Sequence, residues 1–253
     1  MPDQDRPLLA VLIDADNTSP KFAGAIFEEI AAIGEASVRR CYADFSSQQM
    51  AGWNKVQAEH GLVPLHSPAY TVGKNSSDIA LVIDAMDLMH TGRFDGFVLV
   101  SSDSDFTRLA SRIREQGLDV YGIGQQKTPE AFRRVCKRFI FLETLAGTAP
   151  APKPTPPGQR PTPPEKAEAA PQPAPRAAPL TEARDIILRA MDAIDQEDEW
   201  FALGPLGQYI TAANPDFDTR TYGKKKLSDL VQDLRIFETK RGGANQLLIR
   251  RLD

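Results

Sequence analysis

Aspartate residues stand at three separate points of the first 146 residues, each next to an apolar run or a helical pattern. Asp14 and Asn17 follow one apolar run, Asp103 and Asp105 follow another, and Asp78 begins a helical pattern. Carboxylates that share a small volume repel one another, which raises their pKa values unless a cation is present. Hard divalent cations such as magnesium take oxygen ligands and stabilise displacement at a phosphodiester. These residues therefore predict a metal site for phosphodiester chemistry.

The same residue types also have a purely structural interpretation. Asp and Asn are common at strand-to-helix junctions because their side chains cap helices. Asp103 or Asp105 is suited to cap the helix that follows, and Asp78 is suited to interact with the dipole of its own helix. Capping is the better interpretation of any one of them alone. Several such carboxylates at one edge of one sheet favour the metal site.

The pattern of apolar residues predicts how these side chains come together. Short apolar runs alternate with helical patterns, which is typical of a mostly parallel sheet with helices on both faces. Ligand sites in such sheets form beyond the carboxyl ends of the strands. We expect an α/β, three-layer domain at residues 1–146, with Ser19 capping its first helix and Pro20 in the first turn. Its strands are expected at 8–15, 37–45, 62–66, 96–102, 118–124 and 139–143, and its helices at 19–33, 47–60, 76–89, 104–116 and 129–135.

The rest of the chain divides into a linker and a second small domain. The run from Pro150 to Pro179 holds twelve of the twenty prolines and no large apolar residue. Such composition cannot bury enough surface to offset its ordering entropy, so residues 147–180 are expected to be a disordered Pro/Ala-rich linker. Residues 181–253 are expected to form a winged helix-turn-helix domain. Its helices are predicted at 181–194, 203–212 and 224–234, with a β-hairpin at 236–252 turning at Gly242–Gly243.

The totals limit the classes of function. The net charge of −4 gives no global attraction to nucleic acid, so any RNA must be held by local patches or by metal ions. Cys41 and Cys136 are the only cysteines and match no metal-ligand spacing, which predicts free thiols in a reducing cytoplasm. No apolar run reaches the roughly 18–20 residues of a membrane span, and the N-terminus lacks the pattern of a signal peptide. A cytoplasmic protein without a membrane partner is expected.

Residues 1–146 resemble the NYN domain, a PIN-like ribonuclease family. The resemblance lies in VLIDADN (11–17), KNSSDIALVIDAM (74–86) and FVLVSSDSDFTRLASRIREQGLDVYGIG (97–124). It implies a Rossmann-like, PIN-like sheet and metal-dependent cleavage of RNA with Mg²⁺ or Mn²⁺. Transferred position by position, it implies catalytic roles for Asp14, Asn17, Asp78, Asp103 and Asp105, with the four aspartates as metal ligands.

The C-terminal segment resembles an OST-HTH (LOTUS) domain over residues 201–234. Such domains are similar to winged helices and are associated with RNA or with protein partners. A basic helix start and a basic wing suit contacts with phosphate, although a solvated lysine run is an equal alternative. The candidate nucleic-acid-binding residues here are Arg220, Lys224, Lys225, Lys226, Lys240 and Arg241.

Three further residues are weaker candidates. Lys74 precedes the helix that carries Asp78 and is placed to meet a phosphate. Asp44 ends a strand and is placed to line the rim of the site. Trp53 lies in a polar tract and is either a base-stacking surface or, as we expect, a half-buried side chain.

Two other functions fit parts of the sequence. VLIDADNT (11–18) matches the D-x-D-x-T start of haloacid-dehalogenase-like phosphatases, but the order of the later acidic segments suits a nuclease better. Alternatively, the chain is a non-catalytic RNA-binding or regulatory adaptor, in which the acidic pocket is idle and the C-terminal domain carries the function.

Overall fold

The structure is a computed structural model that describes most of the chain outside the linker. The described residues are 6–45, 50–66, 76–146, 180–194, 198–243 and 246–252. The predicted linker, apart from Leu180, lies outside them, and so does Lys74.

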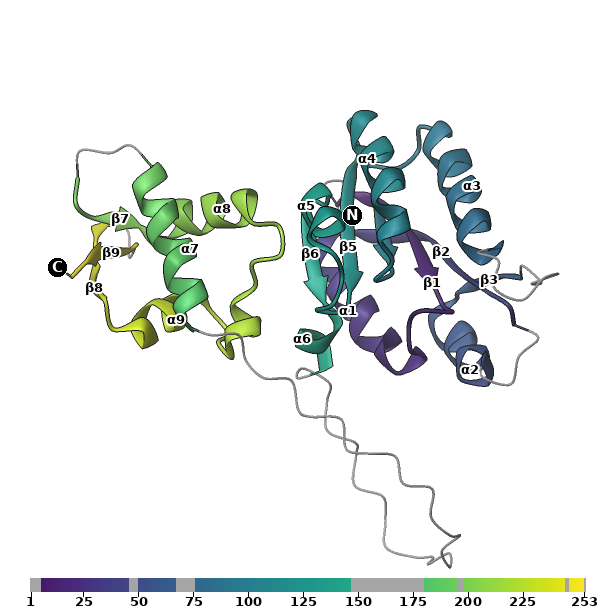
Figure 1. The fold of residues 1–253 in the computed structure, drawn as a ribbon, viewed down its shortest axis with the longest axis horizontal. Coiled ribbons are helices and arrows are strands. Elements are labelled where there is room, and N and C mark those ends of the chain that lie inside the picture. The colour runs from purple at the N-terminus through teal and green to yellow at the C-terminus, as the bar shows by residue number, and fades with distance from the viewer. Residues whose placement is uncertain are drawn as a thin grey trace, which may run out of the picture.

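The N-terminal domain is built on one sheet in which each neighbouring pair of strands is parallel (Figure 1). In the described residues its order is β3-β2-β1-β4-β5-β6, which puts β1 and β4 at the centre. The α/β, Rossmann-like prediction is therefore confirmed. The strands are β1 (Leu8–Asp14), β2 (Glu35–Ala43), β3 (Val63–His66), β4 (Gly96–Val100), β5 (Asp119–Gly124) and β6 (Arg138–Phe141).

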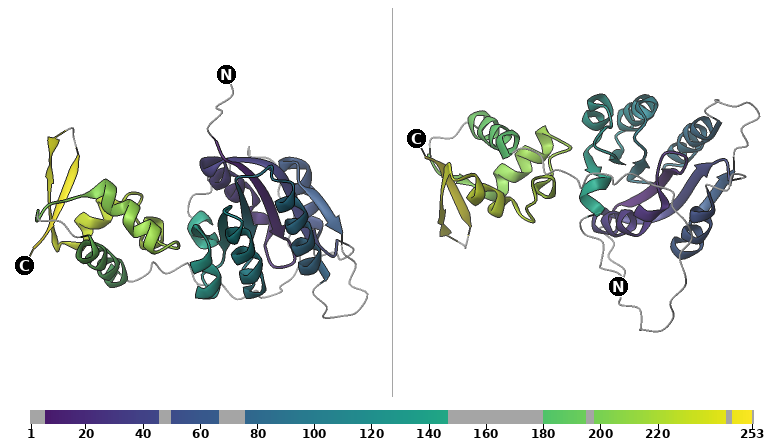
Figure 2. Two further views of the ribbon diagram at one scale, coloured as in Figure 1. Left: turned by 90° about the horizontal axis from the view of Figure 1, so that it is seen from above. Right: turned by 60° about the horizontal axis from the view of Figure 1, so that its bottom comes forward.

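Helices cover both faces of this sheet, as Figure 2 shows from two further directions. The first face carries α1 (Ala23–Ile33), α2 (Ala51–His60) and α6 (Leu142–Ala146). The second carries α3 (Ser76–His90), α4 (Thr107–Glu115) and α5 (Glu130–Val135). Two short 3₁₀ helices, η1 (Pro20–Phe22) and η3 (Ser104–Phe106), lead into α1 and α4.

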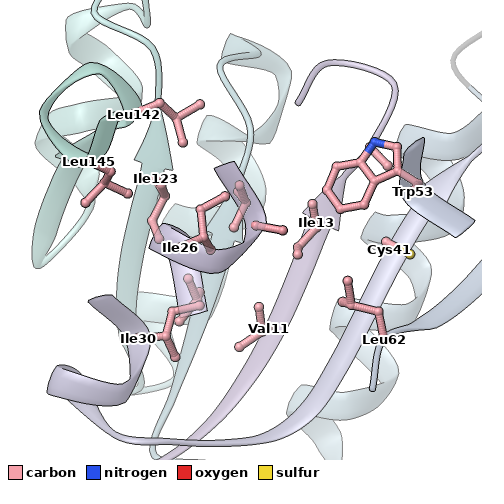
Figure 3. Close-up of a cluster of buried hydrophobic side chains, with 14 of the residues drawn as sticks. Val11, Ile13, Ile26, Ile30, Cys41, Trp53, Leu62, Ile123, Leu142 and Leu145 are labelled. Carbon is pink, nitrogen blue, oxygen red and sulfur yellow. The ribbon is translucent and has the colours of Figure 1, made fainter. Parts of the chain in front are cut away.

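The alternation of side chains along β1 builds both cores. Val11 and Ile13 enter the core under α1 and α2, whereas Ala10 and Leu12 enter the core under α3 and α4. Figure 3 shows the first of these cores, with Trp53 of α2 lying over the end of β1. Because the two cores bury β1 on both faces, its last residues have little freedom to move.

The C-terminal domain packs three helices against a small antiparallel sheet of order β7-β9-β8. The three helices and the sheet contribute to one core, which includes Ile187, Leu206, Ile210, Val231 and Ile249. This is the winged helix-turn-helix arrangement that the sequence predicts. Its elements are α7 (Leu180–Ala193), β7 (Phe201–Ala202), α8 (Leu203–Ala213), η4 (Thr219–Tyr222), α9 (Leu227–Leu234), β8 (Phe237–Arg241) and β9 (Leu247–Arg251).

Three local expectations were wrong. Ser19 precedes η1 but makes no side-chain capping bond, and only Pro20 plays its expected part. The last strand of the sheet ends at Phe141, because the chain turns into α6 at Leu142. The helix predicted from Lys224 begins at Leu227, because the backbone of Lys226 is extended.

Candidate active site

The site begins where the two central strands end side by side. Register pairs Ile13 of β1 with Val100 of β4, so the next residues, Asp14 and Ser101, are neighbours. The Ser101 hydroxyl donates to Oδ2 of Asp14 over 2.7 Å. Asn17 donates to the same carboxylate twice, from its side chain over 2.9 Å and from its backbone N–H over 3.1 Å. Asp14 is thus held in one orientation by three donors.

Burial decides the protonation behaviour of Asp14. The residue is 1% exposed. Desolvation raises the pKa of its carboxyl, and the bonds from Ser101 and Asn17 oppose that rise without cancelling it. The carboxylate is therefore one that a nearby cation would stabilise in its charged form.

The loop after β4 arranges the next two aspartates. The Ser101 hydroxyl accepts the backbone N–H of Asp103 over 3.0 Å, and Asp103 Oδ1 accepts the backbone N–H of Asp105 over 2.9 Å. Asp103 is therefore the N-cap of η3, as the capping interpretation expected. Capping engages Oδ1 of Asp103, so it does not exclude a second role for that side chain.

A glycine lets the neighbouring strand approach this loop. A Cβ at Gly124, the last residue of β5, would lie 2.6 Å from the carbonyl oxygen of Ser101 and 2.9 Å from Oγ1 of Thr128. No real side chain fits at those distances, so only glycine allows the end of β5 to pack against the carbonyl of Ser101.

Asp78 brings the third segment to the same edge. It lies in the first turn of α3 and is partly buried. Burial raises its pKa to about 6, with further increases from the charges of Asp14, Asp103, Asp16 and Asp105, in that order. The structure thus brings the four predicted aspartates into one electrostatic neighbourhood.

A polar network fastens the helix that carries Asp78. The side chain of Asp84, about 1.7 turns further along α3, accepts hydrogen bonds from Arg40 and Tyr42 of β2. Burial, followed by the nearby Asp84 carboxylate, raises the pKa of Tyr42 well above its usual value, so this phenol stays a donor. The network anchors α3 to the sheet and so fixes the position of Asp78.

The chemistry of this cluster fits a hard divalent cation. All its charged donors are carboxylate oxygens, and their mutual repulsion is what a cation relieves. Among the described residues, no three acidic, histidine or cysteine side chains form a ready-made cage for a metal ion. Magnesium does not require one, because it usually keeps several waters and binds one or two carboxylates together with substrate phosphate.

Comparison with known families identifies the domain that carries this cluster. A family model of the NYN domain matches residues 8–143, more than half of the chain. The chain belongs to the NYN domain family. Members of this family are typically nucleases, so the N-terminal domain is nuclease-like and related to RNA. A second model, of the OST-HTH/LOTUS domain, a type of RNA-binding module, matches residues 177–249 and identifies the C-terminal domain as one of this type.

Two solved structures that are similar to parts of this chain belong to proteins whose names state no function. A protein of unknown function from Vibrio parahaemolyticus RIMD 2210633 is 18% identical with a TM-score of 0.48, and the match covers 56% of this chain and 96% of that one. An uncharacterized protein from Nitrosomonas europaea is 34% identical with a TM-score of 0.26, and the match covers 38% of this chain and 91% of that one. No curated protein matches the chain.

NYN membership favours a nuclease over the phosphatase alternative. In that alternative Asp14, Asp16 and Thr18 would be the D-x-D-x-T motif, but Thr18 is buried and its carbonyl accepts the indole N–H of Trp53 over 3.2 Å. Trp53 itself is 1% exposed, so it belongs to the core and offers no base-stacking surface.

The weaker candidate Asp44 lies beside a histidine. Its Oδ1 is 3.9 Å from Nδ1 of His66.

The candidate residues of the OST-HTH domain differ in their contacts. Arg220 pairs with Asp218 and with Glu29 of the NYN domain. Lys224 pairs with Asp233 over 3.0 Å, whereas Lys225 and Lys226 are exposed.

The two candidates on the wing lie near the end of β8. Nζ of Lys240 lies 3.7 Å from the centre of the Trp200 ring, and Arg241 is the exposed last residue of the strand.

None of the described helices combines the length and apolar composition that crossing a bilayer requires.

Sequence reasoning missed two residues of the site. Ser101 connects Asp14 to Asp103, and the exposed Asp16 adds to the charge that acts on Asp78. Both stand inside the motifs that were recognised. The signal for Ser101 was its place directly after the buried strand β4, beside Asp14, the last residue of β1.

Proposed function

We propose that this chain is a metal-dependent ribonuclease, in which the NYN domain hydrolyses RNA phosphodiester bonds and the OST-HTH domain binds the RNA. The gathering of carboxylates from three chain segments carries the proposal. Burial and the neighbouring charges raise the pKa of Asp78 to about 6. A fold that keeps like charges together in this way gains when Mg²⁺ or Mn²⁺ binds, and such tuned groups concentrate at functional sites.

The side chains have distinct parts in this proposal. Asp14, oriented by Ser101 and Asn17, offers a rigid carboxylate at the centre of the sheet. Asp78, Asp103 and Asp105 would complete the oxygen ligands around it. When bound, the ion supplies an activated water and stabilises charge on the phosphodiester. Asn17 acts by positioning, because its amide holds Asp14.

The OST-HTH domain supplies candidate phosphate contacts. Lys225, Lys226 and Arg241 are exposed, and Lys240 is exposed beside Trp200 on the wing. Cations of this kind set the register of an RNA backbone without reading its sequence. Lys74, outside the described residues, remains a prediction for the NYN domain.

The test is cleavage of labelled single-stranded and structured RNAs with Mn²⁺, with Mg²⁺ and with a chelator. Asp103→Asn keeps an oxygen that can accept the N–H of Asp105 but removes the charge, so it tests the site without removing the cap. Asp87→Asn, an exposed change on the helix of Asp78, is the matched control. We expect metal-dependent cleavage that falls by at least about a hundredfold in Asp103→Asn and stays unchanged in Asp87→Asn.

Two observations favour the non-catalytic alternative. The described carboxylates form no closed metal cage, and Asp103 already has a structural part as the cap of η3. If the wild type binds RNA but cuts none of the substrates with either metal, and if binding survives Asp103→Asn, the chain is an RNA-binding adaptor.

A further inference from the structure

The edge of the NYN sheet is covered by the C-terminal domain. β6 is the last strand in the sheet order, and the loop that follows α8 lies beside it (Figure 1). The backbone N–H of Phe139 in β6 donates to the carbonyl of Pro215 in that loop over 2.8 Å. An open strand edge offers unpaired backbone groups to other chains, and this bond satisfies one of them.

A cluster of alternating charges joins the domains on one side of this edge. Glu29 of α1 accepts from Arg138 of β6 over 3.1 Å and from Arg220 of the C-terminal domain over 2.8 Å. Asp218 pairs with Arg220 over 2.6 Å and lies 3.8 Å from Arg138. The two acidic side chains are only 12% and 10% exposed, so solvent screens these pairs less than ordinary surface pairs.

A second group of contacts lies on the other side of the edge. Arg133 of α5 pairs with Asp216, and Arg134 donates to the carbonyl of Ala213 over 3.1 Å. α1 and α5 cover opposite faces of the sheet. Residues 213–220 therefore straddle the edge of β6, with the Phe139 bond between the two polar groups.

We propose that residues 213–220 are a docking segment that fastens the OST-HTH domain across the β6 edge of the NYN domain of the same chain. Residues 147–179, which join the domains, would span roughly 110 Å if extended, so they allow this contact within one chain. A tethered partner is present at an effective concentration of the order of millimolar, which favours even a small ionic interface.

Docking changes the part that Arg220 plays. Its guanidinium is held by Asp218 and Glu29. Hydrogen bonds to these two carboxylates, and their charges, raise the pKa of Arg220 above its usual value. In the docked chain Arg220 positions the OST-HTH domain. Other basic side chains of that domain would then contact the phosphates of the RNA. The proposal concerns domain arrangement and is independent of nuclease activity.

Hydrogen exchange of the Phe139 amide in the full chain tests the proposal, because its bond partner is in the other domain. The reference is the amide of Lys137, which donates to Val120 within the NYN domain. In Arg220→Glu we expect the protection of Phe139 to fall at least about tenfold while that of Lys137 is unchanged. Raising the salt from about 50 mM to about 500 mM should act in the same direction.

Two further variants separate docking from local damage. Arg189→Glu is the matched control, because Arg189 is exposed and its hydrogen bond goes to Asp185 of its own helix. It should leave Phe139 protected. Combining Glu29→Arg with Arg220→Glu returns opposite charges to this one pair. Arg138 and Asp218 then face like charges, so only part of the protection that the single variant loses should return.

Two results would overturn the proposal. Exchange of Phe139 in the wild type as fast as that of an unprotected amide would mean that the domains do not dock. Protection that depends on protein concentration, together with a dimer in light scattering, would mean that the contact joins two copies instead of the two domains of one chain.

Discussion

Ser101 and Asp14 meet at the junction of β1 and β4, where the serine hydroxyl donates to the carboxylate over 2.7 Å. Both residues are almost completely buried. The same hydroxyl accepts the backbone N–H of Asp103 over 3.0 Å. One serine therefore orients two of the aspartates that define the site.

Ser101→Ala should destabilise the NYN domain at neutral pH. The change leaves one oxygen of a buried carboxylate and one backbone N–H without this partner, which costs about 1–3 kcal/mol of the free energy of unfolding. It should also raise the pKa of Asp14 further, because the serine bond lowers it. Urea unfolding at pH 7.5 measures the first effect.

Ser111→Ala is the control for that measurement. The Ser111 hydroxyl bonds only to the carbonyl of Thr107 within α4, among the contacts described. Its loss should change the free energy of unfolding by no more than about 0.5 kcal/mol. Equal effects of the two substitutions would show that the Ser101–Asp14 bond contributes nothing particular.

The carboxyl group of Asp78 should titrate with a pKa of about 6 in the metal-free protein. Burial is the largest cause, and the charges of Asp14 and Asp103 come next. Asp103→Asn removes one of these charges, so the pKa of Asp78 should fall toward 3.8. NMR of the side-chain carboxyl carbons measures both values, and Asp87→Asn should leave the pKa of Asp78 unchanged.

Asp78→Asn should stabilise the domain at pH 7.5 and have a smaller effect at pH 4. A folded-state pKa of about 6 above an ordinary value of 3.8 means that the folded state binds more protons between these pH values. The contribution of Asp78 to stability is therefore present below pH 3.8 and is lost as pH rises through 6. With screening of this partly exposed group, the gain in Asp78→Asn is about 1 kcal/mol. Urea unfolding at both pH values measures the difference. A variant that is less stable than the wild type at pH 7.5 would contradict the prediction.

The inner strands β1, β4 and β5 of the NYN domain were predictable because burial on both faces makes them nearly continuous apolar runs. β1 and β4 are runs of this kind, and the strand-end rule then placed Asp14 and Asp103 together correctly. The same rule gave no warning that β6 stops at Phe141. The apolar sequence continues through Leu142, which packs in the core from a helix instead of a strand.

Pairings between distant residues were beyond the sequence. Arg220 looks like a phosphate contact beside three lysines, yet its partner Glu29 lies 191 positions away. Lys226 gave no signal that its extended backbone delays the start of α9. The sequence shows which residues are charged, but the ion-pair partner of Arg220 depends on how the two domains dock.

Mn²⁺ should raise the melting temperature of the full chain if the acidic cluster holds a cation. A ligand at about ten times its Kd adds about 1.4 kcal/mol to the free energy of unfolding, which is roughly 3–6 °C for a protein of this size. The shift should be smaller in Asp103→Asn, smaller still when Asp78→Asn is added, and unchanged in Asp87→Asn. A chelator should reverse it in the wild type. A full shift that persists in the Asp78→Asn, Asp103→Asn protein would place the bound ion elsewhere, because neither of these carboxylates would then contribute to binding.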